Sequence, residues 1–224
     1  MCGIAGIYSH QPVASELYES IVHLQHRGTD AAGIMTYDDR MHKHKGLGLA
    51  RDVFTKDNIS LLKGNIGISH NRYPTHGEFG HGEIQPVWTS VPYGISIAHN
   101  GQITNYDELV EEVTVKGQRY LNTTSDTEVL LHILAERLTT FQNPNTSKEF
   151  FDLLCDAVTT VFNKVKGAYS VTGIIIDLII DHYNIQSLSG KREHLTGKDF
   201  FDICGEAERI YFEHVMITEE PGMA

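Results

Sequence analysis

The sequence predicts an α+β fold in which helices are layered on mostly antiparallel sheets. Strand-like segments come first in a block, helix-like segments follow in a block, and strand-like segments then return. A doubly wound parallel sheet would instead need a strict alternation of strand and helix. The motifs Gly-x-Gly-x-x-Gly and Gly-x4-Gly-Lys-[Ser/Thr] do not occur, which leaves nucleotide binding through either of them unsupported.

The first part of the chain is predicted to consist of short strands and helices. Small and β-branched residues predict strands, and apolar residues at helical spacing predict helices. The expected strands are 3–8, 33–37, 66–70 and 93–99, and the expected helices are 14–25 and 52–62. Asn100-Gly101 is the strongest short turn signal of the chain and is expected to follow the last of these strands.

Helices dominate the next part. A helix is expected to start at Asn105, and Ser125–Glu128 has the pattern of a capping box that opens a helix through Leu138. A second box, formed by Thr146 and Glu149, predicts a helix to about Val165. Paired strands are expected at 168–180, and a helix at 198–210 and a strand at 215–218 complete the prediction.

Composition favours one soluble domain that spans residues 1–224. Of the 224 residues, 41% are hydrophobic and 21% are charged, and neither a repeat nor a linker interrupts them. The most apolar run, Val171–Ile180, contains Asp177 and is shorter than the roughly 20 residues of a membrane span. A net charge of −11 disfavours nucleic acid and anionic membranes as partners. Without a signal-peptide pattern at the N-terminus, a cytoplasmic protein is expected.

The three cysteines and thirteen histidines do not form a disulfide framework or a metal-ligand pattern. Cys155 is expected on the inward face of a helix, and Cys204 is also expected to be structural. The histidines are interpreted as solvated or pocket-lining residues, so no metal site is predicted. The histidines considered for metal binding are His42, His44, His70, His76 and His81.

Cys2 stands directly after the initiator methionine. If Met1 is removed, one residue carries both a thiol and a free α-amino group. An α-amine has a pKa of about 8, so it can take the thiol proton near neutral pH. The resulting thiolate is a strong nucleophile toward a carboxamide. Taken alone, a cysteine at this position is more often incidental.

Other residues could complete such a site. Asn100 and the backbone N–H of Gly101 could form an oxyanion hole, and Arg72 could bind a carboxylate in bidentate fashion. Asp126, near a helix N-terminus, could bind an ammonium group. Each also has an ordinary interpretation, which is a hairpin turn for Asn100-Gly101, a surface arginine for Arg72 and a capping residue for Asp126.

Taken together, these motifs resemble the class II glutamine amidotransferase domain, in particular the glutaminase domain of the amidophosphoribosyltransferase family. The motifs occur in the order that is typical of this class. They are Met1–Ile7, Leu24–Ile34, Arg72–Gly77, Ala98–Asn105 and Ser125–Glu128.

The resemblance implies a four-layer αββα N-terminal-nucleophile hydrolase fold and a role for each matching residue. It implies that Cys2 forms a γ-glutamyl thioester with L-glutamine, that its α-amine is the base, and that ammonia leaves before water releases glutamate. No cofactor is implied for this reaction. The implied roles are oxyanion hole for Asn100 and Gly101, carboxylate anchor for Arg72, ammonium anchor for Asp126, pocket lining for Thr75 and His76, and support near the nucleophile for Arg27 and Asp30.

The C-terminal part from about residue 177 departs from the family pattern, most clearly at 180–188. The phosphate-binding signature of the family's phosphoribosyltransferase domain is missing, and the magnesium site goes with that domain. We therefore expect the ammonia-releasing half-reaction alone. A non-catalytic glutamine-binding or subunit-interaction paralogue and a truncated copy of the purine enzyme are the alternatives. The ammonia acceptor, whether a separate protein, and a homo-oligomeric state are left open.

Overall fold

The computed structural model describes residues 2–73, 81–139 and 147–175. The chain divides into two units, Met1–Ile179 and Ile180–Ala224, and everything described here lies in the first. The helix expected at 198–210, the strand expected at 215–218 and the diverged segment lie outside the described residues. A single domain over 1–224 thus stays a prediction.

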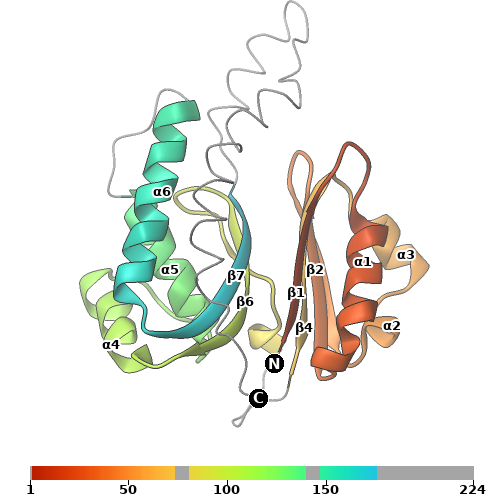
Figure 1. Ribbon diagram of the computed structural model, residues 1–224, viewed down its shortest axis with the longest axis horizontal. Coiled ribbons are helices and arrows are strands. Elements are labelled where there is room, and N and C mark those ends of the chain that lie inside the picture. The colour runs from red at the N-terminus through yellow and green to blue at the C-terminus, as the bar shows by residue number, and fades with distance from the viewer. Residues whose placement is uncertain (1, 74–80, 140–146, 176–224) are drawn as a thin grey trace, which may run out of the picture. The chain divides into compact units, whose positions relative to one another are not determined.

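The first sheet has four antiparallel strands in the order β1-β4-β2-β3. Helix α1 (Ala14–His23), which ends in a 3-10 turn at Leu24–Arg27, covers this sheet together with two short helices (Figure 1). Leu17 and Ile21 of α1 are fully buried and pack with Ala32 and Ile34 of β2. The remaining elements are β1 (Gly3–Tyr8), β2 (Ala31–Tyr37), β3 (Met41–Leu47), β4 (Ile66–Arg72), α2 (Ala50–Val53) and α3 (Lys56–Ser60).

The second sheet has three antiparallel strands in the order β5-β6-β7. Helices α4, α5 and α6 lie on its side away from the first sheet (Figure 1). Ile95 and Ile97 of β6 pack with Leu131 of α5 and Leu153 of α6 in the largest apolar cluster. The elements are β5 (Val87–Thr89), β6 (Ile95–Ile103), α4 (Tyr106–Glu111) with a π-helical turn at Glu112–Lys116, α5 (Asp126–Thr139), α6 (Ser147–Lys164) and β7 (Gly167–Ile175). Within the described residues, no helix is long and apolar enough to cross a membrane.

The two sheets contact each other through a smaller apolar cluster. Met35 and Ile68 of the first sheet pack there with Ala98 and Ile174 of the second. The approach is close at Gly6 of β1, where an added Cβ would lie 2.7 Å from the Thr172 hydroxyl oxygen of β7. This packing brings β1 and β4 against β6, the strand that carries Asn100 and Gly101.

The structure corrects the turn predicted at Asn100-Gly101. Strand β6 continues through both residues to Ile103, and Gly101 pairs with Tyr169 of β7. The ladder with β7 therefore overrides the local turn preference. Strands β3 and β5 were not predicted, and the helix expected at 52–62 is two short helices, α2 and α3.

The prediction that Cys155 lies in the core is wrong, because this residue is exposed. The buried face of α6 is formed by Phe150, Leu153, Ala157 and Val161. At about 100° per residue, Cys155 is about 200° from both Leu153 and Ala157 and so points to the other side of the helix. Partial burial of the thiol group and the negative charge of nearby Asp152 raise the pKa of Cys155.

Candidate active site

Cys2 lies directly before β1 and contacts two segments that are far away in the sequence. Its backbone N–H donates a hydrogen bond to Asn100 Oδ1 of β6 at 2.9 Å. The backbone N–H of Tyr73, just after β4, donates to Cys2 Sγ at 3.5 Å. The packing of the sheets thus places Cys2 beside a side-chain amide.

Residues 27–30 support Cys2 and the end of β4. Arg27 Nε donates to the Cys2 carbonyl at 3.0 Å, and the Asp30 backbone N–H donates to the Arg72 carbonyl at 3.1 Å. Gly28 lies against β4 so closely that an added Cβ would be 2.5 Å from the Arg72 carbonyl oxygen. Any side chain at Gly28 would therefore displace the end of β4 near Tyr73, whose backbone N–H contacts Cys2 Sγ.

Asn100 and Gly101 have geometries that suit an oxyanion hole. A backbone N–H cannot accept a hydrogen bond, so the amide oxygen of Asn100 must face Cys2, and Nδ2 is left as the donor. Gly101 has a φ of +148°, and a Cβ there would lie 2.3 Å from the Ala168 carbonyl oxygen. Both observations require glycine at position 101.

Arg72 ends β4 and forms an ion pair with a residue that the sequence prediction missed. Its Nη1 lies 3.1 Å from Glu83 Oε2, and the two side chains are only 15% and 13% exposed. The other oxygen of Glu83 accepts a hydrogen bond from the Thr124 hydroxyl at 2.9 Å. Glu83 stands in no recognisable motif, so no local sequence signal could have identified it.

Asp126 is the first residue of α5 and lies beside His99 of β6. Its Oδ1 is 3.5 Å from His99 Nδ1, which is also 3.3 Å from the Thr127 hydroxyl. Burial raises the pKa of Asp126, but the hydrogen bond and charge of His99 and the backbone N–H groups of Ile103 and Thr127 outweigh it, so the pKa lies below its usual value. The carboxylate is therefore ionised at neutral pH and can bind an ammonium group.

The capping box predicted at Ser125–Glu128 differs in detail. The helix begins at Asp126, and Ser125 Oγ accepts from the Thr127 backbone N–H at 3.3 Å. The Glu128 carboxylate accepts from the backbone N–H groups of Asn122 and Thr123, at 2.9 and 2.8 Å. Glu128 thus fixes the turn before α5. Thr75 and His76 lie outside the described residues, so their predicted pocket-lining role stays a prediction.

His70 of β4 was predicted, like the other histidines, to be solvated or to line a pocket, and the structure shows that it is fully buried. It pairs with Ile4 of β1, two residues after Cys2. Burial lowers the pKa of His70 to about 3, helped by the charges of His99 and Arg72 and opposed by a backbone hydrogen bond at His99. The His70 ring is therefore neutral at neutral pH.

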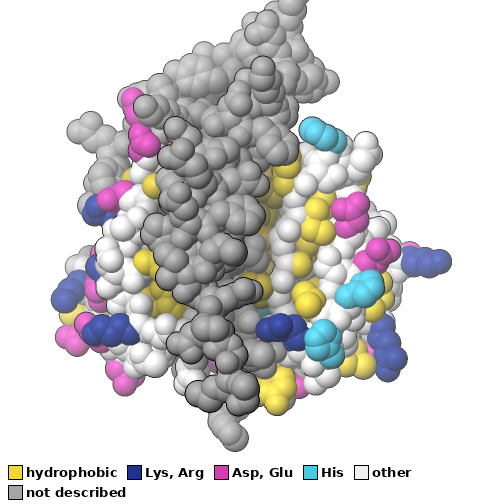
Figure 2. All heavy atoms as spheres, in the orientation of Figure 1, with side chains coloured by type: hydrophobic (Ala, Val, Ile, Leu, Met, Phe, Trp, Pro, Cys, Tyr) yellow, Lys and Arg dark blue, Asp and Glu magenta, His cyan; other side chains and the backbone are white. Residues whose placement is uncertain are grey.

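Several of the other described histidines lie on the surface or bind backbone carbonyls of their own helix. Figure 2 shows exposed histidines, in cyan, on the face over the half of the molecule that contains α1. His23 and His26 bind the backbone carbonyls of Glu19 and His23, at 2.8 and 3.0 Å. Among the described residues, one group of three possible metal ligands comes together, Asp38, Asp39 and His42, with ligand atoms within 4.8 Å.

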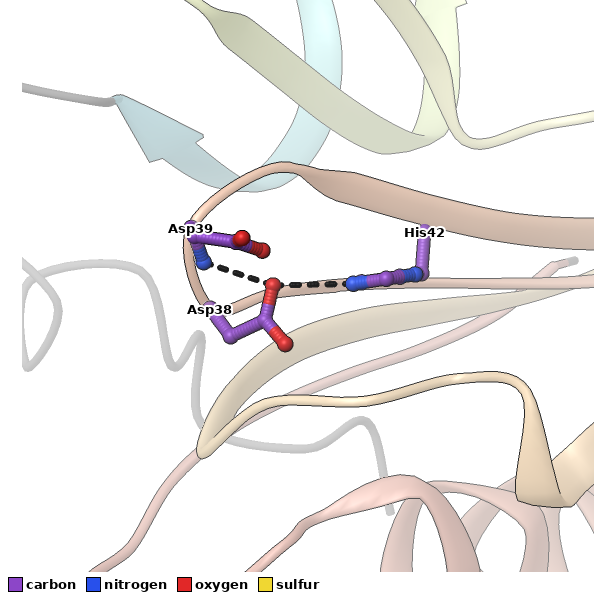
Figure 3. Close-up of side chains that lie close together, drawn as sticks. All are labelled: Asp38, Asp39 and His42. Atoms are coloured by element: carbon purple, nitrogen blue, oxygen red, sulfur yellow. Dashed lines mark hydrogen bonds and ion pairs between the residues drawn. The ribbon is translucent and has the colours of Figure 1, made fainter.

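This group closes the hairpin between β2 and β3 (Figure 3). Asp38 Oδ1 accepts from the backbone N–H of Asp39 at 2.6 Å, from that of Arg40 at 3.2 Å and from His42 Nε2 at 2.8 Å. These hydrogen bonds outweigh the effect of burial and hold the pKa of Asp38 well below its usual range. The Asp38 carboxylate thus stabilises the turn between β2 and β3.

Comparisons with known proteins identify relatives of this chain. A family model described as a glutamine amidotransferase domain matches residues 78–177. Amidophosphoribosyltransferase of Pasteurella multocida is 43% identical over 234 residues, covering 100% of this chain and 45% of that protein. The enzymes of that name from Escherichia coli and Saccharomyces cerevisiae are 41% and 38% identical, covering 79% and 92% of this chain and 35% and 42% of their own lengths.

The chain carries a glutamine amidotransferase domain related to that of amidophosphoribosyltransferases. A solved structure titled as the allosteric regulatory enzyme of purine biosynthesis superposes with a TM-score of 0.66 at 32% identity, over 78% of this chain and 35% of that one. The glutamine phosphoribosylpyrophosphate amidotransferase of Bacillus subtilis gives 0.64 at 31% identity, with the same coverage. The chain spans less than half the length of these relatives.

Proposed function

We propose that this chain hydrolyses L-glutamine to glutamate and ammonia through a γ-glutamyl thioester on Cys2. The observation that carries the proposal is the 2.9 Å hydrogen bond from the Cys2 nitrogen to Asn100. This bond places the proposed nucleophile next to Asn100 of the second sheet. Acyl transfer needs a hydrogen-bond donor near the nucleophile, and Asn100 Nδ2 is available for that role. We also propose that the two sheets and their outer helices form the four-layer αββα arrangement of N-terminal-nucleophile hydrolases.

The first chemical step would use the α-amine that removal of Met1 creates. An amine that donates one N–H to Asn100 Oδ1 keeps its lone pair and can accept the thiol proton. Cys2 Sγ then bonds to the carboxamide carbon, and the carbonyl oxygen becomes an oxyanion. Asn100 Nδ2 and the Gly101 backbone N–H would donate to that oxygen.

Collapse of this intermediate would break the carbon–nitrogen bond. The protonated α-amine returns its proton to the leaving nitrogen, so ammonia departs and the thioester remains. Water, deprotonated by the same amine, adds to the thioester carbonyl, and glutamate and the Cys2 thiol are released. Every group that reacts in these proposed steps comes from the chain, from glutamine or from water, so the proposed mechanism needs no metal or cofactor.

Substrate recognition would rest on two charged residues, Arg72 and Asp126. Arg72 would bind the α-carboxylate of glutamine, and Asp126, which is ionised at neutral pH, would bind its ammonium group. We also propose, from the family resemblance, that Thr75 and His76 line the glutamine pocket. A substrate must carry both charges to use both anchors, which favours a free amino acid over a peptide.

In its cellular role, the chain would supply the ammonia used in purine synthesis, as its relatives' names suggest. The acceptor would lie on a phosphoribosyltransferase domain, which would also hold magnesium. We propose that the protein is cytoplasmic. Its net charge of −11 disfavours binding to nucleic acid and to anionic membranes. A separate acceptor protein would have to dock close to Cys2, since free ammonia is lost to protonation in water.

The test is glutamate release by the purified protein after removal of Met1 has been verified by mass spectrometry. We expect Cys2→Ala to abolish turnover and Cys155→Ala, which removes an exposed thiol, to leave it unchanged. Equal rates for the unmodified protein and Cys2→Ala would refute the proposal. Glutamine binding without turnover in the unmodified protein would instead support a non-catalytic binding module.

A further inference from the structure

Glu83 connects the two predicted substrate anchors. It belongs to the short 3-10 helix His81–Glu83, which lies between β4 and β5 in the chain. One carboxylate oxygen is 3.1 Å from Arg72 Nη1, and the other accepts from the Thr124 hydroxyl at 2.9 Å. Thr124 lies two residues before Asp126. A single side chain thus links the end of β4 to the turn that carries Asp126.

The contact with Arg72 is well suited to orient the guanidinium group. At 15% and 13% exposure the pair is largely shielded from water, so the ion pair is stronger than one on the surface. A guanidinium is planar and has five N–H donors, and fixing one nitrogen fixes the direction of all the others. Holding Arg72 before substrate arrives lowers the entropy lost on binding.

The contact with Thr124 lies in a turn that is also fixed from its other side. Glu128 accepts hydrogen bonds from the backbone of Asn122 and Thr123, at 2.9 and 2.8 Å. Glu83 and Glu128 therefore hold residues 122–124 between them. This turn leads directly into Asp126, the proposed ammonium anchor. The Glu83 carboxylate therefore affects the position of Asp126 as well as the orientation of Arg72.

We propose that Glu83 is a positioning residue that sets the spacing of Arg72 and Asp126 and thereby selects amino acids with both a free α-carboxylate and an α-ammonium group. The inference rests on the proposed function and names a determinant of its substrate specificity. Glu83 does not touch the reacting atoms, so it acts on substrate binding rather than on the chemical step.

The experiment measures binding and turnover separately. In a Cys2→Ala background, calorimetry with L-glutamine should show about 10- to 100-fold weaker binding for Glu83→Ala, because Arg72 loses a shielded charge partner. In the protein with Cys2, KM should rise by a similar factor while kcat stays within about threefold. Glu83→Gln keeps an oxygen acceptor and should lose less. Glu108→Ala, at an exposed residue, should match the unmodified protein.

A second substrate separates positioning from a general structural role. L-glutamine α-amide has the same carboxamide but lacks the carboxylate that Arg72 would bind. We expect Glu83→Ala to reduce the preference for L-glutamine over the α-amide. Equal losses for both compounds, unchanged binding, or tighter glutamine binding through release of Arg72 would each overturn the proposal. If the unmodified protein binds but does not hydrolyse glutamine, the proposed function fails, whereas the binding measurements still decide the role of Glu83.

Discussion

Two clusters of polar side chains in this chain differ in how they are assembled. Asp38, Asp39 and His42 lie within one hairpin, and their hydrogen bonds join residues at most four positions apart. The Cys2 cluster joins residues that are 98, 71 and 25 positions apart. The hairpin cluster can form as soon as β2 and β3 pair, whereas the Cys2 cluster requires both sheets to be folded and packed.

The difference shows why a grouping of ligand-type residues is a weak indication of function by itself. In the hairpin, the carboxylate of Asp38 is used by the turn that it closes. At Cys2, a residue with a thiol meets the side-chain amide of Asn100 and the guanidinium of Arg27, and these residues are far apart in the sequence. Long-range convergence of complementary chemistry is therefore the stronger criterion.

The largest effect is expected where the long-range cluster is broken at Asn100. Asn100→Ala removes both the acceptor for the Cys2 nitrogen and the proposed oxyanion donor. We expect glutamine turnover to fall by about 10²- to 10³-fold. Glutamine binding, measured in the Cys2→Ala background, should change little, because binding depends on Arg72 and Asp126. Turnover within threefold of the unmodified protein would exclude the oxyanion role of Asn100.

An intermediate effect is expected at His70, which is fully buried in β4 and pairs with Ile4 of β1. Its pKa is lowered to about 3, so in the folded state it stays neutral while the unfolded chain takes up a proton below about pH 6.5. The free energy of unfolding should therefore fall as the pH drops from 6.5 toward 3, by about 1.4 kcal/mol per pH unit from this group.

Denaturant unfolding across this pH range measures the effect. His70→Asn should flatten the slope, and His23→Gln, at an exposed histidine that binds its own helix, should not. A slope that is identical in His70→Asn and the unmodified protein would show that His70 does not remain neutral on folding.

The smallest effect is expected at the local cluster. Asp38→Ala removes the acceptor for Asp39, Arg40 and His42, and should lower the free energy of unfolding by about 0.5–1 kcal/mol. Because the folded-state pKa of Asp38 is depressed, its contribution is present at neutral pH and is lost as the pH falls below about 4. Glutamine turnover should be unchanged. A large loss of turnover in Asp38→Ala would remove the distinction between the two clusters.

The sequence predicts much of the fold where local signals are strong. The strand Gly3–Tyr8 has the predicted bounds, and α5 begins within the predicted box. Strand β3, Met41–Leu47, was missed because it is a polar edge strand with two lysines and two histidines. β5 has only three residues and gives no period. The Asn100-Gly101 turn failed because pairing with β7 decides the local conformation there.

Motif order identifies candidate site residues, whose roles stay predictions, but it does not identify partners that are set by packing. The prediction named Cys2, Arg72, Asn100 and Asp126, and the structure gives each a local environment. Glu83 was missed because its role depends on the distance from β4 to the turn before α5, which no local pattern encodes. Cys155 was misplaced because the apolar spacing of α6 left its buried face ambiguous within the helical period.

The most direct measurement is covalent labelling by a glutamine analogue that carries an electrophilic diazoketone in place of the carboxamide. We expect one adduct, located by mass spectrometry on the peptide that begins with Cys2, and protection of that residue by L-glutamine. Cys155 is exposed and serves as the internal control that should stay unlabelled at the same concentration. Labelling of Cys155 to the same extent, or labelling of Cys2 that L-glutamine does not prevent, would contradict a glutamine site at the N-terminus.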